Sequence, residues 1–138
     1  MNRREALTRI CAEHGIAAVY LFGSRADDGL AVLDGAARRG SGSDLDIGLL
    51  FAAAPAPVTR LAQLQIALEE VFAPLRLDLV PLDRVDPIFQ FRAIDGHRIW
   101  AEPSRLADLF ELEVMRSAAE LLPIQRERER ERFGVSTT

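Results

Sequence analysis

Hydrophobic positions along this chain alternate between the spacing typical of helices and that typical of strands. Apolar residues recur at helical spacing in several segments, which predicts helices at residues 3–14, 58–72, 87–94 and from about 104 onward. Shorter, mostly apolar runs are typical of strands in a sheet, and these lie at 16–22, 44–51, 75–80 and 97–101. The alternation predicts an α/β or α+β domain, with a small mixed sheet flanked by helices.

The stretch between the first two predicted strands departs from this pattern. Residues 26–43 contain four glycines and two serines, which favour turns and loops. We therefore expect a surface loop with one helical turn around Leu30–Leu33. Immediately before it, Gly23 and Ser24 should turn the chain, with Ser24 as the cap of a short helix that begins there.

Length and composition limit the class of protein. The 138 residues predict one domain spanning 1–138, and 49% hydrophobic and 28% charged residues are typical of a soluble globular protein. The net charge of −4 argues against a dedicated nucleic-acid-binding surface, which is usually basic. Cys11 is the single cysteine, so no intrachain disulfide is possible and a buried, unreactive thiol is expected. No signal peptide or membrane span is evident, so we expect a cytoplasmic protein.

Two aspartates begin the second predicted strand. Asp44 and Asp46 are two positions apart, so in an extended strand their side chains project to the same face. Carboxylates held that close repel each other unless a positive charge lies between them. Mg²⁺ prefers carboxylate oxygens and keeps coordination sites for water and substrate phosphates, so this pair indicates a magnesium site. The competing interpretation is a turn with two solvated carboxylates.

A second candidate feature follows the first predicted strand, at Gly23-Ser24-Arg25. Glycine lets the backbone approach a phosphate closely because it has no Cβ. The hydroxyl of Ser24 adds a donor, and Arg25 adds a charged fork that suits phosphate. Gly-Ser alone is a weak signal, and its position between an apolar strand and a strand-borne Asp-x-Asp is what strengthens it.

Together these residues resemble the signature of the DNA polymerase β-type nucleotidyltransferase superfamily. That signature is Gly-Ser, a spacer, Asp-x-Asp, and a third carboxylate on a later strand; here these are Gly23-Ser24, Asp44-x-Asp46 and Asp78. The small size is similar to the minimal nucleotidyltransferase (MNT) branch, which is often the antitoxin of a HEPN-domain ribonuclease toxin, as in MntA/HepT-like pairs. The similarity covers roughly residues 5–122, and its three-part motif is its most specific element.

The resemblance implies a fold, a reaction and a partner. Asp44, Asp46 and Asp78 would hold two Mg²⁺ ions, with Asp78 also taking a proton, while Gly23 and Ser24 would hold the β and γ phosphates of ATP. In this branch the product is AMP joined to a tyrosine hydroxyl of the HEPN toxin, which silences the ribonuclease. Homo- or hetero-oligomers are possible, no membrane partner is expected, and direct nucleic-acid binding has no strong support.

The spacer departs from the family pattern. Nineteen residues separate Ser24 from Asp44, about twice the number usual in the family. Segment 26–43 is therefore expected to be a Gly-rich insertion beside the active site, acting as a lid, a partner contact or passive loop growth. Arg38 and Arg39 within it either reach phosphates or form a solvated pair.

Other interpretations remain open at this point. One alternative is that the chain neutralises a toxin by binding alone, with its carboxylates idle; another is that it modifies a small hydroxyl compound such as an aminoglycoside. Side chains outside the motif have simpler explanations. We expect His14 and His97 to be helix-end or surface residues, Trp100, Phe89 and Phe91 to be core residues, and Glu111 and Glu113 to lie on a solvated helix face.

Overall fold

A four-stranded mixed sheet forms the centre of the computed structural model, which describes residues 1–53 and 57–133. The strand order is β3-β2-β1-β4, and the strands are β1 (Ile16–Phe22), β2 (Leu45–Phe51), β3 (Leu77–Pro81) and β4 (His97–Ala101). β1 is antiparallel to β2 and β4, whereas β2 and β3 are parallel. The predicted α+β class with a small mixed sheet is therefore confirmed.

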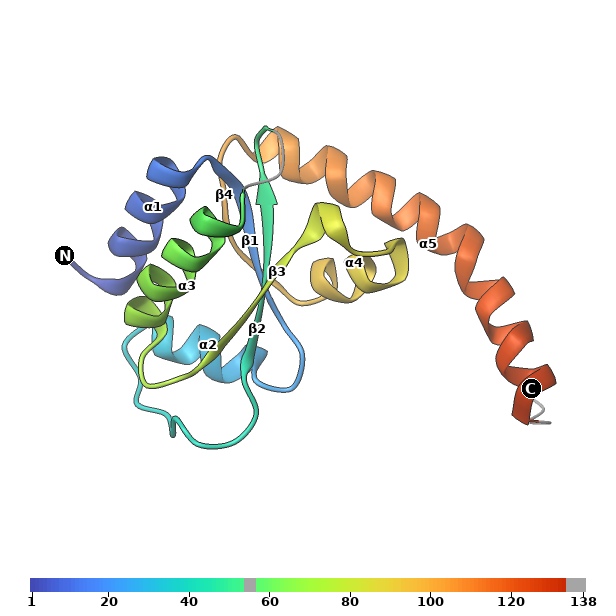
Figure 1. Cartoon of the computed structure of the whole chain (residues 1–138), viewed down its shortest axis with the longest axis horizontal. Coiled ribbons are helices and arrows are strands. Elements are labelled where there is room, and N and C mark those ends of the chain that lie inside the picture. The colour runs from blue at the N-terminus through green and yellow to red at the C-terminus, as the bar shows by residue number, and fades with distance from the viewer. Residues whose placement is uncertain (54–56, 134–138) are drawn as a thin grey trace.

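Helices cover both faces of this sheet. One face carries three helices and the other carries two (Figure 1). They are α1 (Arg3–His14), α2 (Ala26–Leu33) and α3 (Val58–Phe72) on the first face, and α4 (Pro87–Ile94) and α5 (Ser104–Phe133) on the second, with a short 3₁₀ turn at Leu82–Arg84. Four helices and all four strands lie within a few residues of their predicted ranges.

The apolar run of β1 explains its central position. Every residue of β1 is buried. Val19 and Leu21 pack in the core below α1, α2 and α3, whereas Tyr20 and Phe22 pack in the core below α4 and α5. A strand covered on both faces needs apolar side chains at successive positions, which is the pattern that the sequence shows.

Segment 26–43 differs from its prediction. Ala26–Leu33 is a complete helix, longer than the single turn expected around Leu30–Leu33, and it buries Ala26, Gly29, Val32 and Leu33 against the sheet. A Cβ on Gly29 would lie 2.7 Å from a methyl carbon of Leu45. This glycine therefore permits close contact between a helix and a strand, and only residues 34–44 form an irregular connection. The prediction that Ser24 caps this helix is wrong. Arg25 occupies the N-cap position, and its side chain forms no capping hydrogen bond.

A polar network joins the sheet to α5. The buried hydroxyl of Tyr20 donates to Glu111 Oε2 at 2.9 Å, and Arg98 Nη1 donates to the same oxygen at 2.7 Å and to Asp108 at 2.7 Å. Burial raises the pKa of Tyr20, and its hydrogen bond to Glu111 raises it further. Glu111 therefore does not lie on a solvated face as expected, although Glu113 does.

Cys11 is fully buried, as expected, and burial raises the pKa of its thiol to about 12. The thiol is accordingly protonated near neutral pH, which is the unreactive form.

No described helix is both long and apolar enough to cross a membrane. Residues 54–56 of the connector after β2, and residues 134–138, lie outside the described part of the chain.

Replacing Glu111 tests the contribution of this network. Glu111→Ala leaves the Tyr20 hydroxyl and Arg98 without their shared acceptor, so we expect the free energy of unfolding to fall by about 1–3 kcal/mol. Glu113→Ala is the matched control, since the Glu113 side chain is 67% exposed and pairs with Arg116 on the helix surface; its free energy of unfolding should change by no more than about 0.5 kcal/mol. Urea unfolding followed by circular dichroism measures both. Equal losses would contradict a structural role for Glu111.

Candidate active site

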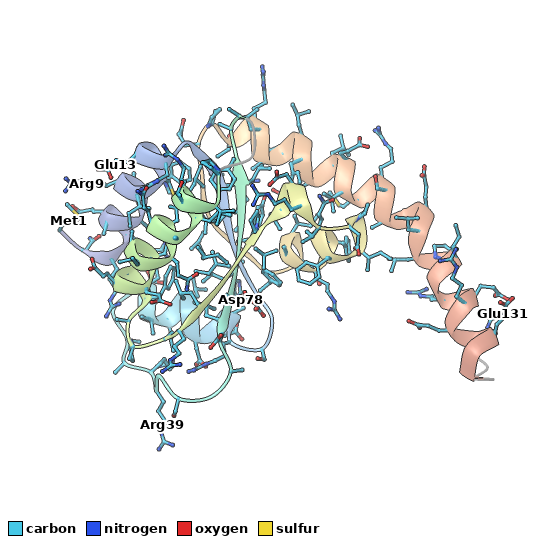
Figure 2. The ribbon with its side chains drawn as sticks, viewed as in Figure 1. Met1, Arg9, Glu13, Arg39, Asp78 and Glu131 are labelled. Carbon is cyan, nitrogen blue, oxygen red and sulfur yellow. The ribbon has the colours of Figure 1, made fainter. Side chains whose placement is uncertain are left out.

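The sheet topology brings the predicted site residues to one end of three adjacent strands. β1 ends at Phe22, directly before Gly23, and it pairs antiparallel with the start of β2, where Phe22 lies opposite Asp46. β3 runs parallel to β2, so Asp78 lies level with Asp46. Asp78 is exposed on β3 (Figure 2). Segments far apart in the sequence therefore meet at this end.

Gly23 lies directly against Asp46. The backbone of Gly23 has φ +78°, in the left-handed region, and a Cβ built there would come within 2.2 Å of Asp46 Oδ2. Any other residue at this position would push the carboxylate aside or distort the turn. The absence of a side chain therefore lets the carboxylate of Asp46 lie directly against the main chain of the turn.

The carboxylates interact with one another. Partial burial raises the pKa of Asp46, and the neighbouring carboxylates of Asp78 and Asp44 raise it further. Raised pKa values from like charges are characteristic of sites that a cation neutralises or that share a proton. Asp46 is therefore the centre of a negative cluster with Asp78 beside it and Asp44 within electrostatic range.

These residues suit a magnesium ion by chemistry and by charge. Carboxylates are the ligands that Mg²⁺ prefers, and the repulsion at Asp46 is relieved by a bound cation. Across the described residues, however, no three acidic, histidine or cysteine side chains are arranged closely enough to bind one ion together. The structure shows a close pair, Asp46 and Asp78, while Asp44 lies just before β2 and is exposed. Metal binding by this set remains a prediction.

The loop that ends at Asp44 contacts the Gly-Ser turn. The hydroxyls of Ser24 and Ser43 lie 3.1 Å apart, within hydrogen-bond distance. Both side chains belong to exposed residues. The long spacer therefore does not separate the two halves of the motif, because its last residue before Asp44 returns to the turn.

Arg25 is directed at this loop. Its guanidinium donates to the carbonyl oxygens of Arg39, at 2.6 Å, and Ser41, at 3.1 Å, and pairs with Asp28 at 3.2 Å. The sequence predicts that Arg25 contacts phosphate, but in this structure its donors are occupied by the loop. The loop carbonyls were not candidates from the sequence, since no local pattern marks contacts that span 14 or more residues. Asp28 is only three residues from Arg25, but an i, i+3 pair is not expected in a segment predicted to be a loop.

The other two arginines of the spacer have different surroundings. Arg38 pairs with Asp28 at 3.1 Å, so it is not simply a solvated residue. Arg39 projects away from the rest of the chain (Figure 2). Among the described residues, no hydrogen bond or ion pair joins either side chain to Asp44, Asp46 or Asp78.

Comparison with known proteins identifies the family. Residues 5–105 match the family described as polymerase beta nucleotidyltransferase. The chain belongs to this family. The match includes Gly23, Ser24 and all three aspartates, and it agrees with the motif found in the sequence. None of the curated proteins compared matches the chain.

Solved structures share the fold of this nucleotidyltransferase. A chain in a mutant MntA–HepT toxin–antitoxin structure aligns with a TM-score of 0.63 and 18% identity, over 94% of this chain and 99% of that one. A toxin–antitoxin structure with AMP-PNP gives 0.60 and 19%, over 91% and 98%. The complex of tri-AMPylated Shewanella oneidensis HEPN toxin with MNT antitoxin gives 0.59 and 17%, over 92% and 96%. These likenesses confirm the nucleotidyltransferase fold.

Gly23→Ala tests the close contact with Asp46. Gly15 provides a matched control, because its φ of +66° is also left-handed but a Cβ there meets nothing within 4 Å. Backbone strain should reduce the free energy of unfolding by about 1–2 kcal/mol in both variants. Only Gly23→Ala should also weaken binding of Mn²⁺ with AMP-PNP, measured by isothermal titration calorimetry. Equal binding by the two variants would show that Gly23 does not border the site.

Asp46→Asn tests the electrostatics of the cluster. Because the pKa of Asp46 is raised in the folded chain, its ionised form destabilises the metal-free fold above that pKa. In EDTA, the variant should have a larger free energy of unfolding than the wild type at pH 7, and this gain should shrink as the pH falls through the raised pKa. Asp83→Asn, at an exposed aspartate, should show no such gain. A gain independent of pH would contradict charge repulsion as its cause.

Proposed function

We propose that this chain is a Mg²⁺-dependent adenylyltransferase that transfers AMP from ATP to a tyrosine hydroxyl of a cognate HEPN ribonuclease toxin, and so acts as its antitoxin. The observation that carries the proposal is the meeting of Asp46, Asp78 and Gly23 at one end of the sheet. Membership of the polymerase beta nucleotidyltransferase family supports the reaction class.

The protein's own residues have separate roles in this reaction. The backbone at Gly23 and the hydroxyl of Ser24 would bind the phosphates, since main chain can approach closely at a glycine. Asp44, Asp46 and Asp78 would hold Mg²⁺, which when bound offsets the charge of the triphosphate and lowers the pKa of the attacking hydroxyl. Asp78 is exposed and at the end of the cluster, where it can accept the proton of the incoming hydroxyl.

The transfer exchanges one bond at the α-phosphorus of ATP for another. A bond forms between the tyrosine oxygen and the α-phosphorus of ATP. The bond from that phosphorus to the oxygen bridging the α and β phosphates breaks, and pyrophosphate leaves. The tyrosine proton passes to Asp78, so no additional reactant is required.

The choice of acceptor rests on structural relatives. One of the similar structures is of a tri-AMPylated HEPN toxin with its MNT antitoxin, and another contains AMP-PNP. These relatives are under 20% identical to this chain, so they support the donor and acceptor as hypotheses. A cytoplasmic location is the expectation that accompanies such a partner.

A second candidate function is neutralisation by binding alone. Its support is an apolar stripe on the outer face of α5, where Leu109, Leu112 and Met115 are 55%, 53% and 47% exposed. Exposed apolar side chains that gather on one face are typical of protein contacts. In this alternative the antitoxin covers its toxin and the carboxylates are not required.

The double substitution Asp44→Asn and Asp46→Asn separates the two functions. With the cognate HEPN protein, ATP and Mg²⁺, we expect the wild type to add the mass of AMP to the toxin, detected by intact-protein mass spectrometry. Loss of metal ligands should reduce the rate at least about a hundredfold and leave the toxin active in a ribonuclease assay.

Asp83→Asn serves as the control, because it removes one aspartate charge at an exposed position beyond the far end of β3; it should transfer AMP at the wild-type rate. Full neutralisation by the double variant, without any mass shift, would favour binding alone. The absence of AMP transfer by the wild type would reject the proposed chemistry.

A further inference from the structure

We propose that Arg25 is a positioning residue, which fastens the end of the long spacer to the Gly-Ser turn and thereby restrains Asp44 at the edge of the carboxylate cluster. The catalytic consequence rests on the proposed function, whereas the fastening itself does not. In this role Arg25 acts through the loop and does not touch the nucleotide.

The contacts of Arg25 lie far along the chain from it. Its Nη2 donates to the carbonyl of Arg39 at 2.6 Å, and its Nη1 donates to Ser41 at 3.1 Å and lies 3.5 Å from the carbonyl of Ser43. The side chain is only 11% exposed. Alternate carbonyls of one loop segment therefore converge on a single, mostly buried guanidinium.

Asp44 needs such support because the sheet does not hold it. β2 begins at Leu45, whose amide donates to the carbonyl of Arg76 at 2.8 Å. Asp44 itself precedes the strand and is exposed. The peptide group before Asp44 carries the Ser43 carbonyl that faces Arg25, so the guanidinium restrains the main chain next to this aspartate.

The loop is held from its other side as well. A Cβ on Gly40 would come within 2.4 Å of the carbonyl oxygen of Pro74, so the loop backbone lies against the segment that leads into β3. Gly42 has φ +108°, and its Cβ position would lie 3.8 Å from Arg25 Nη1. The loop is thus confined between Arg25 and Pro74. Because Pro74 leads into β3, which carries Asp78, the loop links the surroundings of Asp78 to those of Asp44 and Asp46.

Only arginine supplies this pattern of donors. Its planar guanidinium offers five N–H groups in a fixed fork, whereas the ammonium of lysine is a compact point charge with three donors. Asp28 completes the arrangement, since it pairs with Arg25 Nε at 3.2 Å and with Arg38 at 3.1 Å. Arg25→Lys therefore keeps the charge and removes the fork.

Limited trypsin digestion tests the fastening directly. The Arg39–Gly40 bond is a trypsin site, and the carbonyl of that bond is the one that Arg25 holds. Because cleavage follows the population of the open loop, Arg25→Lys and Arg25→Ala should be cut there about tenfold faster than the wild type. Cleavage within the exposed 126–130 region of α5 is an internal reference, and mass spectrometry identifies each fragment.

Arg4→Ala is the matched control. Arg4 pairs with Asp34 at 2.6 Å, at the opposite end of the same connection, and does not contact the segment at 39–43. This variant should be cut at Arg39–Gly40 at the wild-type rate. An unchanged rate in both Arg25 variants would overturn the inference, and if Arg25→Ala fails to fold, as judged by circular dichroism, Arg25→Lys decides.

Binding of Mn²⁺ in the presence of AMP-PNP tests the effect on Asp44. Displacing a supporting group should weaken Mn²⁺ about tenfold in Arg25→Lys, with Arg4→Ala unchanged, as measured by electron paramagnetic resonance of free Mn²⁺. Equal Mn²⁺ affinity in the wild type and Arg25→Lys would overturn the positioning role alone. A wild type that binds no Mn²⁺ would instead reject the metal site and the proposed function with it.

Discussion

Repulsion between carboxylates at one end of the sheet is the constraint on which the rest of this structure depends. Parallel pairing of β2 and β3 places Asp46 and Asp78 level with each other, so neither can avoid the other without a change of register. A one-residue slip would turn every side chain of a strand to the opposite face and would expose the apolar side of β2. The core that fixes this register therefore also maintains the unfavourable charge pair.

Apolar burial in the interior of the fold offsets the free-energy cost of this repulsion. β1 is buried along its whole length, between a core below α1, α2 and α3 and a second core below α4 and α5. Both cores hold β1, which ends at Phe22 directly before Gly23, and β2 pairs beside it. Natural proteins commonly break local rules at functional sites while the surrounding structure supports them, and the negative cluster at the end of this well-packed sheet fits that description.

Much of the architecture could be predicted from the sequence, because it depends on local patterns. The apolar run at 16–22 marks an interior strand, Gly15 ends the first helix in the left-handed conformation, and Pro87 begins α4. The family motif led us to expect Gly23, Asp46 and Asp78 close together, and the pairing of β1, β2 and β3 brings them there. These features require only periodicity, turn chemistry and the spacing of a known signature.

The remainder depends on contacts that a local pattern does not reveal. Segment 26–33 was expected to be a loop with a single helical turn because of the glycines and serines in 26–43, but Gly29 lies in a helix where the side chain of Leu45 leaves no room for a Cβ. Glu111 appeared solvated, yet its partner Tyr20 is distant in the sequence. The contacts of Arg25 were not predictable either, because the carbonyls that it meets belong to a loop whose path no periodicity describes.

One property of the Arg25 contacts bears on how this loop can evolve. The bonds to residues 39, 41 and 43 are made to main-chain oxygens, which every amino acid carries. Side chains at positions 39 and 41 are therefore open to substitution, provided that the backbone keeps its path, whereas Ser43 also contacts Ser24 through its hydroxyl. The surface beside the aspartates can in this way diversify between related proteins while the geometry beneath it is preserved.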